Sequence, residues 1–246
     1  MKRILLILLS VTTVWLCTAC QNDDRTDPSS GNSSSTTESS DISDEPVPAR
    51  SLLDDSFGTL YGGTAYYLET DMTVESTSSP DTSNRYHLTV AIDKTANQAM
   101  LLMSVENGTQ NHIIIRDRQS YNLNDTDKTY TVQSFEDSIE LFAKLYTSDL
   151  YLGITEPLTM MDTGNKKITV DGNEQEVTYE EYRMAPSDSS AGVTDEAYIT
   201  YYFDKGQPCM EIMETAGGKT TFVFRKVTDQ FPDKTLFDIP NGYERV

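Results

Sequence analysis

The chain is poor in the residue types on which several functional classes depend. Its 246 residues include three Cys, two His and one Trp, and 19 Lys and Arg stand against 39 Asp and Glu, which gives a formal net charge of −20. Three Cys supply no disulfide framework. The shortage of basic residues argues against a nucleic-acid partner, because neutralising phosphates requires clustered Lys and Arg. It equally argues against docking on anionic lipid through a basic patch.

Sequence patterns for catalysis and metal binding are missing as well. There is no Gly-x-Ser-x-Gly elbow, P-loop, Gly-x-Gly-x-x-Gly turn or calcium-binding loop. His87 and His112 are expected to be exposed strand residues, since a metal site would need them paired with acids on adjacent strands. Glu180 and Glu181 adjoin in an expected strand and so point to opposite faces. Cys209 is expected to be a buried, inert thiol because no His accompanies it. We therefore expect no enzyme activity, no cofactor and no metal.

The N-terminus has the layout of a secretory signal. A basic start, Met1-Lys2-Arg3, precedes an apolar run over residues 4–16, and the small residues Thr18 and Ala19 stand before Cys20. The apolar run is shorter than the roughly 20 residues that a membrane span needs. The pattern therefore predicts export rather than a transmembrane helix.

The end of this segment resembles the lipobox of bacterial lipoproteins, in which small residues precede a Cys that becomes the first residue of the mature chain. The resemblance implies that residues 1–19 are a lipoprotein signal peptide, cleaved between Ala19 and Cys20, and that Cys20 carries a diacylglyceryl thioether. Two acyl chains anchor a protein stably where one would be marginal. The expected location is the extracytoplasmic face of the cell membrane, with a lipid anchor. The residues alone leave open an ordinary signal peptide with an incidental Cys20, or an uncleaved anchor.

Residues 20–50 are expected to be a disordered linker that starts at the acylated Cys20. Ser, Thr, Asp and Glu dominate this segment, and its sizeable apolar residues are Ile42 and Val47. Such a segment cannot bury enough apolar area to offset its chain entropy. The folded domain is therefore expected over residues 51–246.

The domain has the pattern of a single β-rich unit. The segment 85–93 alternates well, because Tyr86, Leu88, Val90 and Ile92 fall on one face. Strands are expected over residues 66–75, 85–93, 99–105, 112–116, 120–123, 129–132, 167–171, 175–184, 196–204, 208–215 and 220–227. Turns are expected at Asn107-Gly108, Gly172-Asn173, Lys205-Gly206 and Gly217-Gly218, with a polar loop over 185–194.

One amphipathic helix interrupts the strands. Ser134 is placed as its N-cap, with Asp137 three residues on. The apolar stripe of this helix consists of Phe135, Ile139, Phe142 and Tyr146. Residues 51–60 are expected to form at best a short helix. We therefore predict an α+β fold: a large curved antiparallel sheet, or half-open β-barrel, with the helix packed on its concave face.

The end of the chain carries the most recognisable motif. Residues 233–244, in which Leu236-Phe237 is followed by Ile239-Pro240 and Gly242-Tyr243, resemble the closing segment of LolA/LolB-like lipoprotein carriers and LppX/LprG-like proteins. The hairpin around Gly172-Asn173 agrees with the same group. The resemblance implies a half-open β-barrel whose concave side is capped by helices, and an apolar cavity that holds acyl chains or another hydrophobe.

A cavity of that kind would be lined by the alternating strands and by the stripe of the helix. The candidate ligand-binding residues are Tyr86, Leu88, Val90, Ile92, Met100, Leu102, Ile139, Phe142 and Tyr146. The 14 Tyr and nine Met suit such a lining, because Met adapts to irregular ligands and Tyr can line a cavity while its hydroxyl stays wet. The alternative, that these residues fill an ordinary core, stays open.

Two functions follow from these observations. The first is a membrane-anchored extracytoplasmic lipoprotein that binds or carries a lipid or other hydrophobic ligand in a cavity between sheet and helix. The second is a non-enzymatic envelope protein that uses the same fold to interact with, or sense, a protein partner. An exposed apolar patch without a cavity would favour the second.

Overall fold

The computed structural model describes residues 51–106, 110–147, 158–185 and 196–246, apart from the side chains of residues 80–82 and 144–147. The chain divides into two units, residues 1–49 and 50–246, and all described residues belong to the second. The expected signal peptide, Cys20 and the linker therefore lie outside the described residues. The same holds for the Asn107-Gly108 turn and for most of the 185–194 loop.

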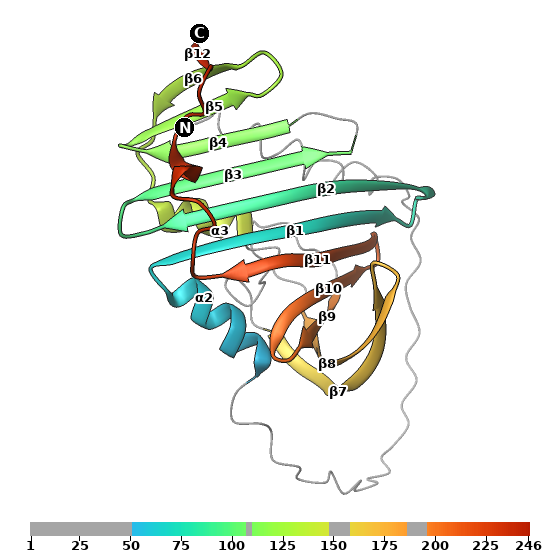
Figure 1. Ribbon diagram of the computed structural model, residues 1–246. Helices are drawn as coiled ribbons and strands as arrows, with labels where there is room; N and C mark the ends of the chain where they lie inside the picture. The colour runs from blue at the N-terminus through green and yellow to red at the C-terminus, as the bar shows by residue number, and fades with distance from the viewer. Residues whose placement is uncertain (1–50, 107–109, 148–157, 186–195) are drawn as a thin grey trace, which may run out of the picture. The chain divides into compact units, whose positions relative to one another are not determined.

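The described residues form one sheet of twelve strands in the order β12-β6-β5-β4-β3-β2-β1-β11-β10-β9-β8-β7. The strands are β1 (Ala65–Ser76), β2 (Ser79–Asp93), β3 (Gln98–Val105), β4 (Gln110–Arg116), β5 (Gln119–Asn124), β6 (Thr129–Ser134), β7 (Leu158–Val170), β8 (Asn173–Met184), β9 (Ala197–Asp204), β10 (Gln207–Thr215), β11 (Gly218–Thr228) and β12 (Glu244–Arg245). Neighbours pair antiparallel except for the short β12, which runs parallel to β6. Two meanders thus meet where β1 pairs with β11, near the middle of the sheet (Figure 1).

Tight turns between neighbouring strands explain much of this order. Asp171-Gly172 and Lys205-Gly206 each have two consecutive positive φ angles, which is the geometry of the two-residue hairpin turn that matches sheet twist. The β7–β8 turn is thus at Asp171-Gly172, one residue earlier than expected, because Val170 pairs with Asn173. Strand β7 also begins at Leu158, nine residues before the expected strand.

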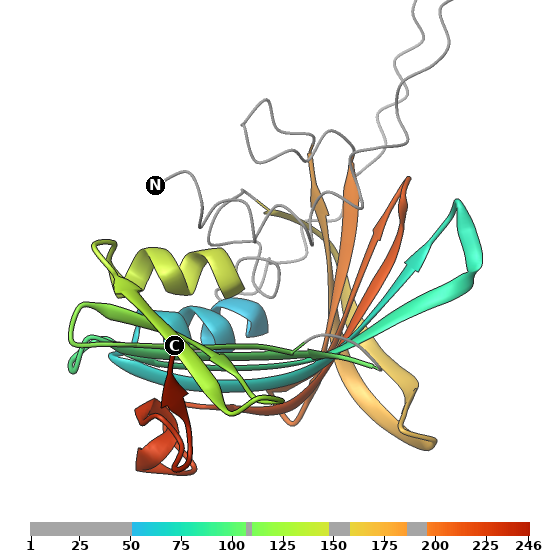
Figure 2. The same ribbon diagram turned by 90° about the horizontal axis from the view of Figure 1, so that it is seen from above.

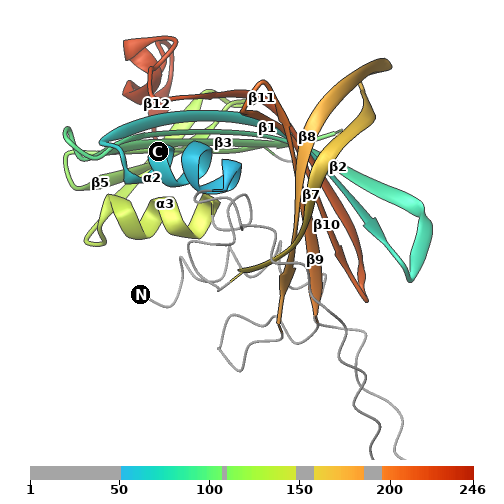
Figure 3. The same ribbon diagram turned by 90° about the horizontal axis from the view of Figure 1, so that it is seen from below.

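The sheet bends sharply, and the helices lie inside the bend (Figure 2). The strands β1–β6 form one side of the bend and β7–β10 the other, and Figure 3 shows the same arrangement from below. Helix α3 (Ile139–Thr147) lies in the bend beside a second helical segment, which consists of the π-helix η1 (Asp54–Gly58) and α2 (Thr59–Gly62). We call the face that carries these helices the inner face and the opposite one the outer face. The predicted curved antiparallel sheet with a helix on its concave face is confirmed, but a second helical segment joins the first.

Helix α3 begins later than the sequence pattern predicted. Ser134 still belongs to β6, where it pairs with Gln119, and the Phe135 N–H donates to the Arg118 carbonyl. The cap is instead Ser138, whose hydroxyl accepts a hydrogen bond from the Leu141 N–H at 3.1 Å. The sheet therefore keeps the backbone extended through the predicted cap.

The inner face holds the largest apolar cluster. It joins strands from both sides of the bend to η1, α2 and α3, and its fully buried members include Phe57, Tyr66, Ile92, Ile139 and Tyr201. Burying each such side chain contributes on the order of 1.5–3 kcal/mol of transfer free energy. The cluster is therefore the main connection between the two sides of the bend.

The outer face carries two smaller clusters. One contains Tyr67, Ala91, Met100, Ile114, Leu123 and Phe237. It is covered by the 3₁₀-helix η3 (Lys234–Phe237), which Figure 2 shows on the side opposite to α3. The other contains Ile168, Val177, Tyr202 and Met210, from strands β7–β10.

The closing motif holds the C-terminus to the sheet. Asp233 caps η3 by accepting the Thr235 N–H at 2.8 Å. The Tyr243 hydroxyl donates to Asp125, at the turn between β5 and β6, and Asp125 also pairs with His112 at 3.1 Å. Tyr243 thus fixes the tail to the edge of the sheet.

Candidate functional site

The structure brings five of the predicted ligand-binding residues together on the inner face. Leu88, Val90 and Ile92 of β2 belong to the same cluster as Ile139 and Phe142 of α3. Every one of them is buried by neighbouring side chains. In the described part of the chain, the space between β2 and α3 is therefore filled by the protein itself.

The other predicted residues lie elsewhere. Met100 and Leu102 face the outer cluster under η3, because alternation along β3 sends even-numbered residues to that face while Leu101 points inward. Their assignment to the helix-covered side is corrected accordingly. Tyr86 lies further along β2 and lines an open pocket, and the side chain of Tyr146 is outside the described residues. Ligand binding by any of the nine residues stays a prediction.

The aromatic contacts of Phe57 on the inner face are not predicted from the sequence. Phe57, with none of its surface exposed, lies with its ring centroid 5.3 Å from that of Phe224 and 6.1 Å from that of Tyr201. Leu53 and Leu60 are also buried on the inner face. The spacing of residues 53, 57 and 60, at i, i+4 and i+7, is the signal that could have identified this segment as an amphipathic helix.

Glu180 is a buried carboxylate that holds the start of the helical segment. Only 3% of its surface is exposed, and it accepts hydrogen bonds from the Leu52 N–H at 2.7 Å and the Leu53 N–H at 3.0 Å. The Tyr182 hydroxyl donates to it at 2.9 Å. Burial, and then the hydrogen bond to this carboxylate, raises the pKa of Tyr182 above its usual value, although the nearby Ser51 side chain acts in the opposite direction. Glu180 therefore satisfies N–H groups that the first helical turn leaves unpaired.

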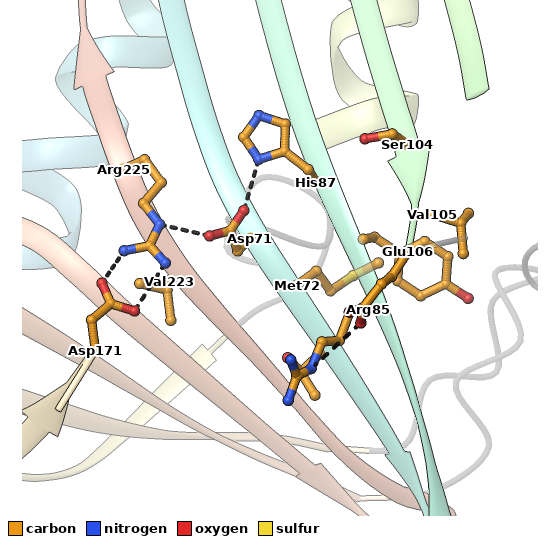
Figure 4. A pocket seen from close by; sticks show the side chains of 12 residues that line it. Asp71, Met72, Arg85, His87, Ser104, Val105, Glu106, Asp171, Val223 and Arg225 are labelled. Atoms are coloured by element: carbon orange, nitrogen blue, oxygen red, sulfur yellow. Dashed lines mark hydrogen bonds and ion pairs between the residues drawn. The ribbon is translucent and has the colours of Figure 1, made fainter. Parts of the chain in front are cut away.

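The outer face has an open pocket of about 470 Å³ where β1, β2, β3 and β11 run side by side (Figure 4). Asp71 stands at its centre, with Oδ1 2.7 Å from His87 Nδ1 and Oδ2 accepting from Arg225 Nε at 2.7 Å. Arg225 also donates two hydrogen bonds to Asp171, the turn residue between β7 and β8. Arg85, at the same pocket, lies 3.9 Å from a carboxylate oxygen of Glu106.

These pairings shift the acidity of the pocket residues. Burial alone would raise the pKa of Asp71, but the hydrogen bonds from His87 and Arg225 outweigh burial and hold this pKa below its ordinary value. The hydrogen bond from Arg225 likewise lowers the pKa of Asp171, and its two carboxylate partners raise the pKa of Arg225. The lowered pKa values of Asp71 and Asp171 favour the ionised form of both carboxylates.

Asp71, His87 and Ser104 lie opposite one another across β1, β2 and β3. However, His87 Nε2 is 3.5 Å from Thr89 Oγ1 and 3.7 Å from Glu69 Oε1, and no hydrogen bond joins His87 to Ser104 in the described structure. A nucleophilic serine needs that bond to the imidazole. The arrangement of Asp71, His87 and Ser104 therefore does not activate Ser104 as a nucleophile.

The remaining candidate residues are structural in character. His112 pairs with Asp125 and only 14% of its side chain is exposed, so the expectation of an exposed histidine is wrong. Cys209 is half-buried, its thiol lies 3.3 Å from the Tyr202 carbonyl, and burial raises its pKa. Within the described ranges, no group of three or more His, Cys, Asp or Glu side chains could hold a metal ion, and no helix could span a membrane.

Comparison with known proteins adds distant structural neighbours. No protein-family model matches the chain, and no curated protein matches it. LprF from Mycobacterium bovis is 10% identical, with a TM-score of 0.43 over 74% of this chain and 95% of LprF. LppX from Mycobacterium tuberculosis is 14% identical, with a TM-score of 0.40 over 73% of this chain and 96% of LppX. A LolA superfamily protein from Nitrosomonas europaea is 8% identical, with a TM-score of 0.34 over 76% of this chain and 95% of its own.

The names of these neighbours belong to the LolA/LppX-like group that the closing motif resembles. Likenesses with TM-scores below 0.5 decide neither ligand nor activity.

Proposed function

We propose that the chain is a lipoprotein whose domain binds a lipid or other hydrophobic ligand between the inner face and its helices. The main support for the proposal is that short helices cover the apolar inner face. An apolar surface that spans both sides of the bend is covered, among the described residues, by two short helical segments. Short helices are marginal alone and persist through packing, and a ligand of similar polarity can take over the apolar contacts that they make.

Methionine side chains form the rim of this apolar surface and can adapt their contacts to a ligand. Met72, Met103, Met160 and Met213 are partly buried and pack against the inner cluster. Methionine is unbranched and polarisable, so it fits ligands of irregular shape. Such a rim is suited to flexible chains better than to a rigid polar molecule.

The anchor belongs to the same proposal. The lipobox-like residues Thr18, Ala19 and Cys20 support acylation at Cys20, and the lipid would hold the domain at the extracytoplasmic face of the membrane. Metabolic labelling of the full chain with a palmitate analogue tests this step. Incorporation that Cys20→Ser abolishes and Cys17→Ser leaves intact is expected, and labelling that survives Cys20→Ser contradicts the anchor.

Native mass spectrometry tests ligand binding. The chain from residue 20 onward, with Cys20→Ser, would be purified without detergent from the cells in which it occurs. An added mass that organic extraction releases as a lipid or another apolar molecule is expected. A protein of unmodified mass that also fails to take up added fatty acid would overturn the proposal.

The second candidate function is an interaction with an envelope protein. The outer pocket favours it, because Arg85 and Glu106 expose more than half of their side chains beside the Asp71–Arg225 network. Cross-linking of the full chain in intact cells, compared with the double variant Arg85→Ala, Glu106→Ala, tests this candidate. Loss of a specific cross-linked partner in the variant supports it, and an unchanged cross-linking pattern counts against it.

A further inference from the structure

Strand β7 ends the twelve-stranded sheet in the described part of the chain, and it is long for an edge strand (Figure 1). It covers 13 residues, Leu158–Val170, and β8 is its one neighbour among the described strands. Strands in globular proteins most often have five or six residues. The free edge of β7 therefore offers an unusually long row of main-chain donors and acceptors to another strand.

The hairpin turn decides which residues form this row. Val170 and Asn173 flank the two-residue turn, so they are a hydrogen-bonded pair, and such pairs alternate with non-hydrogen-bonded pairs along an antiparallel ladder. Every second residue of β7 consequently directs its main-chain N–H and C=O away from β8. These residues are Thr163, Asn165, Lys167 and Thr169.

Two opposite charges flank Gly164 on the outer face of this edge. Tyr179, which packs against the outer cluster of β7–β10, contacts both of them. Its hydroxyl donates to Asp162 at 2.6 Å, and its ring centroid lies 5.8 Å from the Lys166 ammonium. The Tyr179 ring also covers Gly164, where an added Cβ would lie 3.2 Å from it. Asp162 and Lys166 are four strand residues apart, about 13 Å at 3.3 Å per residue, which is too far for an ion pair within one chain.

A second copy of the chain complements this edge. When two identical edge strands pair antiparallel, the two-fold axis stands perpendicular to the sheet, so outer side chains of one copy meet outer side chains of the other. With the axis at Gly164, Asp162 of each copy lies opposite Lys166 of the other. A shift by one step that preserves the faces places Lys166 opposite Gly164 or Met160 instead, and both ion pairs are lost. Charge therefore selects one register.

We propose that two copies of the protein pair through their β7 strands, antiparallel and centred on Gly164, with two Asp162–Lys166 ion pairs across the axis. This inference goes beyond the proposed function and does not depend on a ligand. A single strand pair is a small interface, so the association is of the weak class. The net charge of −20 repels the two copies, but salt screens exposed charges beyond about 8 Å at physiological ionic strength. The dimer is therefore expected at high protein concentration.

The alternative is an edge that is protected against pairing. Exposed Lys residues and β-bulges keep natural edge strands apart, and β7 has both Lys166 and an irregular register between Met160 and Asp162. The two explanations predict opposite effects of Lys166→Asp. The substitution weakens a dimer in which Lys166 meets Asp162, whereas it promotes association at an edge that Lys166 protects.

Charge reversals test the dimer by sedimentation velocity. The chain from residue 20 with Cys20→Ser would be measured at physiological salt up to about 0.5 mM, as a small interface requires. Lys166→Asp and Asp162→Lys each place like charges opposite one another, and a dimer Kd about tenfold higher is expected for either variant. The double variant should restore the Kd to within about twofold of the original. Lys167→Asp is the matched control, because it makes the same change of charge on the inner face, where the other copy presents no carboxylate.

Hydrogen exchange locates the interface without any substitution in β7. Pairing makes the N–H groups of Thr163 and Asn165 donate to the other copy, so their exchange should slow as the protein concentration rises. The Gly164 N–H, which faces β8, should show no such change. A chain that stays monomeric at the highest concentration, or a dimer that tolerates both charge reversals, overturns the proposal. Stronger association of Lys166→Asp also overturns it and identifies a protected edge.

Discussion

Arg225 on β11 hydrogen-bonds Asp171, which lies 54 residues away at the turn between β7 and β8. The same guanidinium holds Asp71 on β1, 154 residues away. One side chain thus connects the strand pair in the middle of the sheet with the tip of the hairpin at its edge. Because Asp71 in turn pairs with His87, four residues from four segments form one hydrogen-bonded row across the outer face (Figure 4).

Replacing Arg225 should release the tip of the β7–β8 hairpin. Arg225→Lys keeps the charge but loses the planar fork that reaches two carboxylates, so faster hydrogen exchange is expected at residues 170–173 with a small loss of stability to urea. Lys167→Ala is the matched control on the same hairpin, because the Lys167–Glu174 pair is largely exposed. Equal exchange in both variants would show that Arg225 does not hold the turn.

Asp71 should make the stability of the domain depend on pH. Its pKa is lower in the folded chain than in the unfolded one, so its contribution is complete above the unfolded value of 3.8 and is lost as pH falls toward the folded value. The urea midpoint of the wild type should fall between pH 5 and pH 3 by more than that of Asp71→Asn. Parallel pH profiles for the two proteins would contradict this assignment.

Ile139 should contribute much of the free energy that holds α3 against the sheet. Its side chain is buried between the helix and the sheet, whereas Leu141 on the same helix is 44% exposed. Ile139→Ala should lower the free energy of unfolding by about 2–5 kcal/mol, and Leu141→Ala by less than about 0.5 kcal/mol. Denaturant unfolding of the two variants measures both values, and similar losses would mean that the helix does not pack as described.

Cys209 should react slowly until the domain unfolds. Its pKa is raised by burial, so at pH 8 the folded chain holds little reactive thiolate. In the chain from residue 20 with Cys20→Ser, Cys209 is the single thiol. Labelling by a thiol-reactive disulfide reagent should be slow in buffer and fast in urea. Rapid labelling of the folded protein would contradict the described environment.

The strand pattern was predictable where residues alternate between apolar and polar, and not elsewhere. Tyr86, Leu88, Val90 and Ile92 give β2 its face, and Gly-containing turns separate the later strands. In the first half of β7, Leu158 and Met160 pack against the inner cluster, but the exposed Asp162 and Thr163 soon follow, so the apolar alternation is too short to mark a strand. The start of α3 was misplaced because pairing with β5 overrides the local capping signal at Ser134.

The candidate site could be predicted only in part for the same kind of reason. Alternation correctly put Leu88 and Ile92 on one face, but an apolar run on both faces of β3 gave no sign that Met100 belongs under η3. From the sequence, Glu180 does not pair with Glu181, because adjacent strand residues point to opposite faces. Its role depends on backbone N–H groups 127 residues earlier in the chain, and no local pattern encodes that contact.

The pairing of β1 with β11 has a consequence for how the protein matures. Each meander can form from local hairpins as the chain emerges, but the two meanders become one sheet only when the last long strand arrives. Because synthesis starts at the N-terminus, the unpaired edge of β1 and the apolar face beside it stay exposed until synthesis is nearly complete. Such an intermediate needs protection while the chain is being completed, and truncations that remove β11 should be degraded rather than accumulate as a half-sized domain.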